Sequence, residues 1–186
     1  GTIELKNDFT PAGEGPVLPR IGVTFRLASE YKILRWYGRG PFENYPDRQA
    51  AAAMGLWSGT VADQYVPYVR PQENGAKTDV RWLALTNATG RGLVITAGEP
   101  LAAMSALPFT AHDLASVRNE YQLKPRDETV VSLDARHLGL GNSSCGPGVL
   151  ARYAIPLQPT SLTLVIRPCA TAENTALADL ARKPVR

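Results

Sequence analysis

Glycine and proline recur so often along this chain that they constrain its fold more than any other feature. The 186 residues include 16 glycines and 15 prolines, which interrupt the sequence at short intervals. Such interruptions leave room for short strands and turns but for few long helices. Hydrophobic residues make up 44% of the chain, which is enough to bury a core. The sequence therefore predicts an all-β fold, a large sandwich of antiparallel strands joined by long loops.

Alternation of apolar and polar residues locates several of these strands. It predicts strands at residues 2–5, 21–26, 80–86, 93–95, 130–133 and 161–166, the last of them stopped by Pro168. Within residues 80–86, Val80, Trp82 and Ala84 are expected to share one face of the strand. Residues 87–90 have the composition of a turn, so the strands on either side of them are expected to form a hairpin.

Two segments have a helical pattern. Thr110 or His112 is placed to cap a short helix that runs through Val117. Residues 172–182 are rich in alanine and leucine and form either a surface helix or a frayed end. We predict one sandwich domain over residues 1–168 and a C-terminal tail over residues 169–186. The strand-like start of the chain runs into a flexible Pro- and Gly-rich stretch, and we interpret this as a domain from a longer protein.

Charge and cysteine content exclude several classes of function. The formal net charge is +3 and the basic residues are scattered, whereas a nucleic-acid partner needs them clustered on one face. No apolar stretch approaches the roughly 20 residues that cross a bilayer, so no membrane partner is expected. Cys145 and Cys169 are too few for a disulfide framework, and no Cys/His spacing is typical of zinc. We predict neither a metal nor another cofactor.

Two polar motifs are compatible with either a structural or a ligand-binding role. Residues 36–48 combine glycines, prolines and aromatic residues with Glu43, Asp47 and Arg48, and form either a rigid loop held by an ion pair or a polar site with aromatic walls. Residues 65–75 place tyrosines near Glu73 and end in an Asn-Gly turn signal, which fits a structural turn and a ligand contact equally well.

A third motif, at residues 137–148, consists mainly of small residues and predicts an exposed loop after a strand. Its two glycines at 139 and 141 lack the third glycine and the following helix of a dinucleotide-binding motif. A nucleophilic Cys145 would need a histidine nearby in space, and His137 is eight residues away in sequence.

These three segments, in this order, resemble the C-terminal domain of glycoside hydrolase family 2 β-galactosidases, the β-galactosidase small chain. The matching landmarks are residues 18–22, 40–48, 65–75, 79–82, 133–134 and 137–146. The resemblance implies a supersandwich similar to that of galactose mutarotases. It also implies that a catalytic (β/α) barrel of the parent chain, against which this domain packs, supplies both catalytic carboxylates. No catalytic residue is expected in this chain, and the isolated chain is expected to be inactive.

The resemblance also implies roles for particular residues. In the family, a loop of this domain reaches the edge of the galactoside pocket, where a tryptophan stacks on the sugar. That position falls at Cys145, which cannot stack on a sugar ring, so substrate contact here must differ. The expected substrate-binding residues are His137, Asn142, Ser144 and Cys145. The residues expected to brace the loops are Glu43, Asn44, Tyr45, Asp47, Arg48, Tyr68, Glu73 and Asn74.

Two alternatives belong to other functional classes. A sugar-binding module would use aromatic residues on the concave face of the sandwich. An aldose 1-epimerase-like enzyme would need a general acid and a general base, typically His and Glu, facing one sugar. If the chain is a scaffold, an exposed apolar patch should mark the barrel interface, and the isolated domain could self-associate through it. The sequence leaves open whether the compartment is bacterial cytoplasm or periplasm.

Overall fold

The computed structural model describes residues 1–13, 17–142 and 145–184. Nine strands form the framework of the described chain: β1 (Ile3–Phe9), β2 (Arg20–Ala28), β3 (Ile33–Gly40), β4 (Ala53–Thr60), β5 (Val80–Thr86), β6 (Arg91–Leu101), β7 (Ala103–Leu107), β8 (Glu128–His137) and β9 (Thr160–Ala170). The helices among these residues are α1 (Ala111–Ser116) and α2 (Asn174–Arg182), with single 3₁₀ turns η1 (Ala62–Gln64), η2 (Glu120–Gln122) and η3 (Ala151–Tyr153). None of the helices in this part of the chain is long and apolar enough to cross a membrane.

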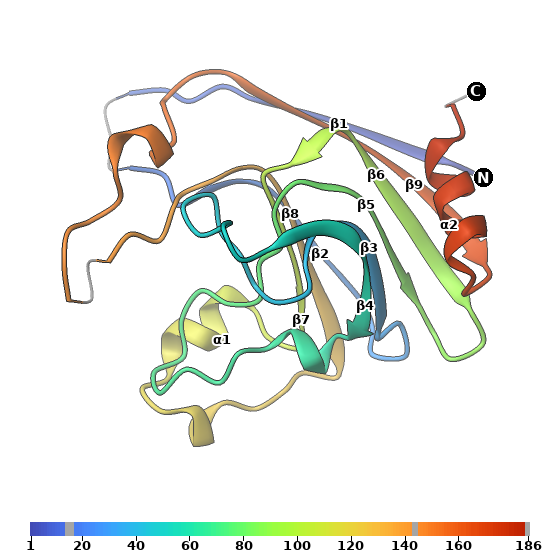
Figure 1. The fold of residues 1–186 in the computed structure, drawn as a ribbon, viewed down its shortest axis with the longest axis horizontal. Coiled ribbons are helices and arrows are strands. Elements are labelled where there is room, and N and C mark those ends of the chain that lie inside the picture. Colours follow the sequence, from blue (N-terminus) through green and yellow to red (C-terminus); the bar gives the residue numbers. More distant parts are fainter. Residues whose placement is uncertain (14–16, 143–144, 185–186) are drawn as a thin grey trace.

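The strands form two antiparallel sheets (Figure 1). The larger sheet has the order β1-β9-β6-β5-β3-β4, and the smaller has the order β2-β8-β7. Every strand pairing is antiparallel. The predicted all-β antiparallel sandwich is therefore confirmed, and the likeness to galactose mutarotases stays a prediction.

The main hydrophobic core lies between the two sheets. It joins side chains of the larger sheet to side chains of the smaller one: Leu34, Trp36, Val80, Leu83, Leu85, Ile95, Leu101, Leu162 and Leu164 with Met104, Ala106, Val131 and Leu133. The opposite face of the larger sheet is partly covered by α2, whose Leu177 packs on Trp82, Ala84, Val94 and Cys169. Of the two forms predicted for residues 172–182, the packed surface helix is the one observed.

Two local predictions were wrong. The last strand does not stop at Pro168 but runs to Ala170. Pairing with β1 ends at Ile166, so Pro168 lies where β9 has a neighbour on one side only, and a proline is tolerated there. Val80 does not share a face with Trp82, because the β5–β6 pairing shifts register between them and turns Val80 into the main core.

The short helix α1 begins where one of the two predicted caps placed it. The Thr110 hydroxyl accepts a hydrogen bond from the Asp113 N–H, and the Asp113 carboxylate accepts one from the Thr110 N–H. This reciprocal pair satisfies backbone donors that a helix start leaves open. Thr110, and not His112, is therefore the cap.

Candidate functional site

The carboxylate of Glu43 is held by donors from two loops. It accepts hydrogen bonds from the hydroxyls of Tyr68 and Tyr45, the latter at 3.3 Å, and from the Gly75 N–H at 2.8 Å. Burial, together with the nearby charges of Glu73 and Glu43, raises the pKa of Tyr45 above its ordinary value. Burial and the bond to Glu43 raise the pKa of Tyr68 to about 12. Both phenols therefore stay protonated and act as donors at neutral pH.

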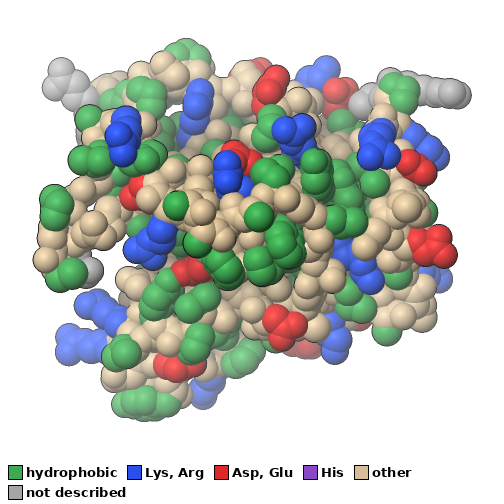
Figure 2. All heavy atoms as spheres, viewed as in Figure 1, with side chains coloured by type: hydrophobic (Ala, Val, Ile, Leu, Met, Phe, Trp, Pro, Cys, Tyr) green, Lys and Arg blue, Asp and Glu red, His purple; other side chains and the backbone are tan. Residues whose placement is uncertain are grey.

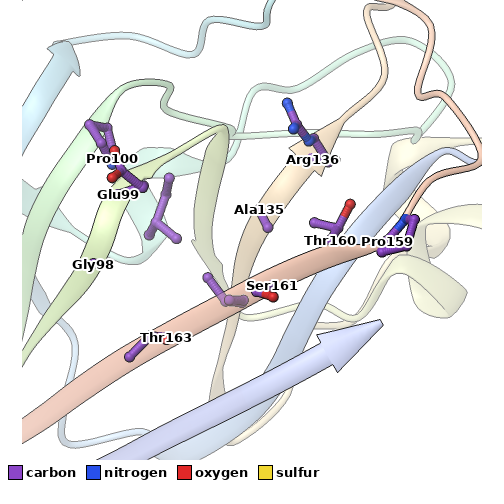
Figure 3. A pocket seen from close by; sticks show the side chains of 11 residues that line it. Gly98, Glu99, Pro100, Ala135, Arg136, Pro159, Thr160, Ser161 and Thr163 are labelled. Carbon is purple, nitrogen blue, oxygen red and sulfur yellow. The ribbon is translucent and has the colours of Figure 1, made fainter. Parts of the chain in front are cut away.

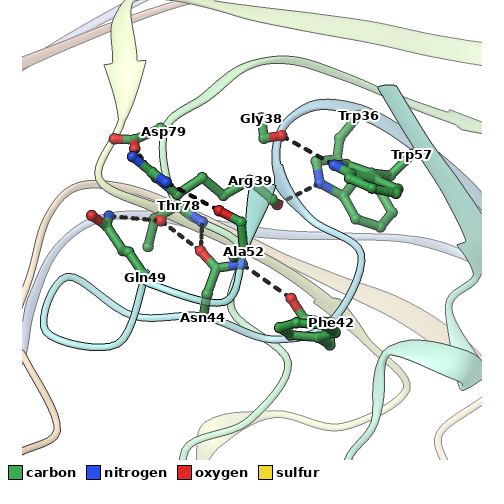
Figure 4. A network of polar contacts seen from close by, with 10 residues as sticks. All are labelled: Trp36, Gly38, Arg39, Phe42, Asn44, Gln49, Ala52, Trp57, Thr78 and Asp79. Carbon is green, nitrogen blue, oxygen red and sulfur yellow. Dashed lines mark hydrogen bonds and ion pairs between the residues drawn. The ribbon is translucent and has the colours of Figure 1, made fainter. Parts of the chain in front are cut away.

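Asn44, which is 0% exposed, connects the 41–49 loop to residues 76–78. Its side-chain oxygen accepts hydrogen bonds from the N–H and the hydroxyl of Thr78, at 2.9 and 2.5 Å, and its amide nitrogen donates to the Phe42 carbonyl at 3.0 Å (Figure 4). The same view shows Gln49 donating to the Thr78 hydroxyl at 2.9 Å and Arg39 paired with Asp79 at 2.5 Å. Buried polar groups with this many partners fix the loop in one conformation.

Asn74 holds the neighbouring loop. Its side-chain oxygen accepts from the Val66 N–H at 2.8 Å, and its amide nitrogen donates to the Val66 carbonyl at 2.7 Å. Gly75 follows in the left-handed region with a φ of 72°, and an added Cβ would lie 2.8 Å from the Gln64 carbonyl oxygen. The Asn-Gly turn signal therefore marks a place where only glycine fits without strain.

A partly buried ionic cluster joins the start of β2, the end of β8 and the 65–75 loop. Arg20 lies 2.9 Å from Asp134 and 3.6 Å from Glu73, measured between side-chain nitrogen and oxygen. The His137 Nε2 atom lies 3.6 Å from the same Glu73 oxygen, and its Nδ1 atom lies 2.7 Å from the Leu138 carbonyl oxygen. The four side chains come from segments far apart in the sequence, so the fold alone assembles them.

The carboxyl groups of this cluster are shifted in opposite directions. Burial raises the pKa of Asp134 to about 6, although the charge of Arg20 opposes the shift. Burial also disfavours the charged form of Glu73, but contact with His137 and the charge of Arg20 outweigh it and lower the pKa of Glu73. Near neutral pH the cluster thus holds two carboxylates around one guanidinium and one imidazole.

Asp47 anchors the third motif. Its carboxylate accepts hydrogen bonds from the Leu140 N–H at 3.0 Å and the Gly141 N–H at 2.7 Å. Gly139 packs so closely that an added Cβ would lie 2.7 Å from the Asp47 carboxyl carbon, and Gly141 has a φ of 62°. The motif at 40–48 therefore fixes the start of the 137–148 loop through the hydrogen bonds that the Asp47 carboxylate accepts.

Beyond this anchor the loop is exposed. Residues 138–142 and 145–158 project from one end of the sandwich, away from the helix α2 (Figure 1). Asn142 and Cys145 are exposed, and the described backbone bonds there run from the Asn142 N–H to the Pro147 carbonyl at 3.0 Å and from the Cys145 N–H to the Asn142 carbonyl at 2.9 Å. Ser144 lies outside the described residues.

The structure separates the predicted sugar contacts. Asn142 and Cys145 lie at the loop tip, whereas His137 is buried at its base, with a side chain only 4% exposed and paired with Glu73. The predicted bracing residues do come together, in the contacts given above. Arg48 joins them through its N–H, which donates to the Tyr45 carbonyl at 2.7 Å, and through its charge beside Tyr68.

One buried residue had no signal in the sequence. Lys77 is 1% exposed, donates to the Gly75 carbonyl at 3.0 Å and lies 5.4 Å from the centre of the Trp36 ring. Burial lowers its pKa to about 8, although Glu43 favours the charged form. A buried lysine is rare enough that no local pattern predicts it.

Comparison with known proteins assigns the arrangement to a family. Residues 1–166 match the family described as the β-galactosidase small chain. This chain belongs to that family. The predicted resemblance is confirmed, and it covers the sandwich together with all three polar motifs.

Members of the small-chain family with curated names support the same assignment. A β-galactosidase of Priestia megaterium is 39% identical over 76% of this chain, one of Arthrobacter sp. strain B7 is 38% identical over 88%, and one of Lactobacillus delbrueckii subsp. bulgaricus is 35% identical over 90%. These matches cover only 14%, 16% and 17% of the respective relatives. The small-chain sequence thus corresponds to a minor part of each named enzyme.

A cleft of this small-chain fold lies at a split in the larger sheet. The ladder between β6 and β9 ends at the pair Ala97 and Leu164, and beyond it a cleft of about 600 Å³ opens (Figure 3). Glu99 and Arg136 are its charged lining residues, facing the stretch of β9 at 160–163. Among the described residues, no three His, Cys, Asp or Glu side chains gather to hold a metal ion.

Proposed function

We propose that this chain is a non-catalytic domain of a β-galactosidase. Hydrolysis of terminal β-D-galactosides is then carried out by a catalytic (β/α) barrel elsewhere in the protein. The observation that carries the proposal is the state of the motif carboxylates. Glu43 and Asp47 are occupied by protein donors, and Glu73 and Asp134 are paired with Arg20. A glycosidase needs two carboxyl groups facing one scissile bond, about 5–10 Å apart.

An exposed apolar patch supports packing against another domain. We define it as Tyr37, Met54 and Leu56, each of which is at least 38% exposed. Tyr37 pairs with Leu56 across β3 and β4, on the face opposite Trp36 and the core. In Figure 2, hydrophobic side chains gather near the centre of the face where Figure 1 places these strands. A patch of this kind marks an interface with the barrel, or with a second copy when the domain is alone.

The projecting loop supports a contribution to the sugar pocket. Asp47 fixes its base, while Asn142 and Cys145 stand exposed at the tip. A loop with a rigid base and an exposed tip is suited to reach a neighbouring domain. Because Cys145 has no aromatic ring, it provides a small, polarizable contact in place of a stacking platform.

The direct test of the non-catalytic role is an assay of the purified chain with a nitrophenyl galactoside. We expect no turnover above the background of the same preparation carrying Glu43→Gln or Glu73→Gln. Glu173→Gln, at an exposed position before α2, is the matched control for the substitution itself. Turnover that Glu173→Gln retains and either motif variant abolishes would overturn the proposal.

The loop contribution needs the larger protein. In a β-galactosidase that contains this chain, a bulky thiol reagent on Cys145 is expected to raise KM more than it lowers kcat. Cys169 is buried against α2, so it serves as the internal control that should not react in the folded protein. Unchanged KM after complete labelling of Cys145 would show that the loop does not approach the pocket.

A further inference from the structure

A second polar cavity lies away from the projecting loop, on the outer face of the three-stranded sheet. Its volume is about 290 Å³. The floor comes from β2, β8 and β7, one wall from residues 107–114 and the other from Arg20, Glu73 and Asn74. We propose that this cavity binds one neutral monosaccharide. The inference is independent of the proposed function, because it concerns binding to this chain alone.

A row of three hydroxyl groups forms the floor. Thr24, Ser132 and Ser105 are direct neighbours across β2, β8 and β7. They face away from the main core, which takes the alternate side chains of the same strands, such as Val131 and Met104. The Thr24 and Ser132 hydroxyls are 3.1 Å apart and share a hydrogen bond.

Ser105 completes this row. The residue is only 6% exposed and lines the cavity, and its hydroxyl is not among the buried polar atoms that lack a hydrogen-bond partner. A ligand hydroxyl would therefore replace solvent at Ser105, and a hydrogen bond formed in such an exchange contributes about 1 kcal/mol.

The charged wall selects a neutral ligand. The buried Nε atom of Arg20 has no hydrogen-bond partner among the residues that the structure describes, and Glu73 presents a carboxylate. An anion would be repelled by Glu73, and a cation would be repelled by Arg20. A sugar hydroxyl can donate to the carboxylate and accept from the guanidinium, so it satisfies both.

The opposite wall is apolar. Leu107, Phe109 and Leu114 form a small cluster that lines this side of the cavity. A pyranose ring has polar edges and less polar faces, which matches a site with hydroxyls on the floor and hydrocarbon on one wall. The volume is at the lower limit of ordinary ligand sites, roughly 300–1,000 Å³. It therefore fits one ring, and the second ring of a disaccharide would extend outside the cavity.

The experiment is an NMR titration of the isotope-labelled chain with galactose and glucose, followed by lactose, galacturonate and galactosamine. We expect saturable shifts at the amides of Ser105, Phe109 and Ser132, with a dissociation constant on the order of millimolar, as is usual for so few contacts. The two charged sugars and lactose should bind more weakly than galactose.

Variants then test the hydroxyl row. Ser105→Ala and Thr24→Val should each weaken binding about fivefold, the effect of one hydrogen bond of ordinary strength. Thr24→Val keeps the β-branched shape at an exposed position, so it preserves the fold if Ser105→Ala does not. Ser58→Ala, on the distant strand β4, is the matched control and should leave binding unchanged.

Three results would overturn the inference: no shifts up to high millimolar sugar, shifts confined to the 138–150 loop, or affinities that both hydroxyl variants leave unchanged. Equal or tighter binding of galacturonate would overturn the neutral ligand class.

Discussion

The loops at the base of the polar region and the loop that projects from it differ in how deeply their polar groups are buried. At the base, residues 41–49 and 65–79 contain Asn44, Glu43 and Asn74, each with two or three hydrogen bonds. In the projecting loop, the side chain of Asp47 holds residues 140 and 141, and Asn142 and Cys145 are exposed beyond it. The distinctive motif is therefore the support, and the exposed tip is the part free to vary with function.

The sharpest test of this contrast removes one asparagine side chain from each region. Asn44→Ala should lower the free energy of unfolding by about 3 kcal/mol, because it leaves buried donors of Thr78 without an acceptor. Asn142→Ala should change it by less than about 0.5 kcal/mol. Chemical denaturation of both variants measures the difference, and similar losses would erase the contrast.

Asp134, which shares an ionic cluster with Glu73 of the base, has a charge whose free-energy cost depends on pH. The pKa of Asp134 is raised to about 6, whereas an exposed aspartate titrates near ~4. Between these values the folded protein keeps a proton that the unfolded chain has released, so the stability that this group contributes falls as pH rises from ~4 to ~6. Asp134→Asn should remove this decline, which amounts to about 3 kcal/mol over the whole window, whatever the substitution does to stability at a single pH.

The measurement is the free energy of unfolding of both proteins across that pH window. Glu73, whose pKa is lowered, contributes the opposite slope, with stability that is present above about pH 4 and lost as pH falls. It is present in both proteins, so the difference between the two curves reports Asp134 together with its electrostatic coupling to Glu73. Parallel curves would show that Asp134 titrates normally.

Replacing Asp47 should break the hydrogen bonds that connect the base to the projecting loop. Asp47→Ala leaves the Leu140 and Gly141 amides without an acceptor and should cost about 1.5 kcal/mol. Hydrogen exchange should accelerate at these two amides, while the Val66 amide, held by Asn74, stays protected. Equal acceleration at all three amides would mean that the base itself depends on Asp47.

The smallest effect is expected at the tip. Cys145→Trp should change the free energy of unfolding by less than about 0.5 kcal/mol, because the side chain is exposed. A thermal shift of the variant measures this. A large loss of stability would show that the tip contributes to the free energy of unfolding as the base does.

Much of the sandwich follows from local pattern. The alternation in residues 80–86 and 161–166 found real strands, because one buried face leaves a two-residue period. The orientation of Val80 and the passage of β9 through Pro168 did not follow, because each depends on where a neighbouring strand shifts register or ends. Such information lies in the partner strand and not in the segment itself.

The polar site was predictable only in part. Glycines and acidic residues marked the motif loops, but the pairing of Arg20 with Asp134 joins residues 114 positions apart and has no local signal. The burial of His137 follows from a shared cluster with Glu73, which sequence spacing cannot reveal. Residues that act through long-range contacts become visible only when the two sheets are assembled.

The buried amine of Lys77 can be used to follow local opening of this fold. Acylating reagents must reach an uncharged amine, and the burial that lowers the pKa of Lys77 to about 8 also keeps them away while the protein is folded. The fold shields it, since only 1% of the residue is exposed, while lysines on the surface react at once. Slow acylation at this one position therefore measures how often the protein opens around Lys77.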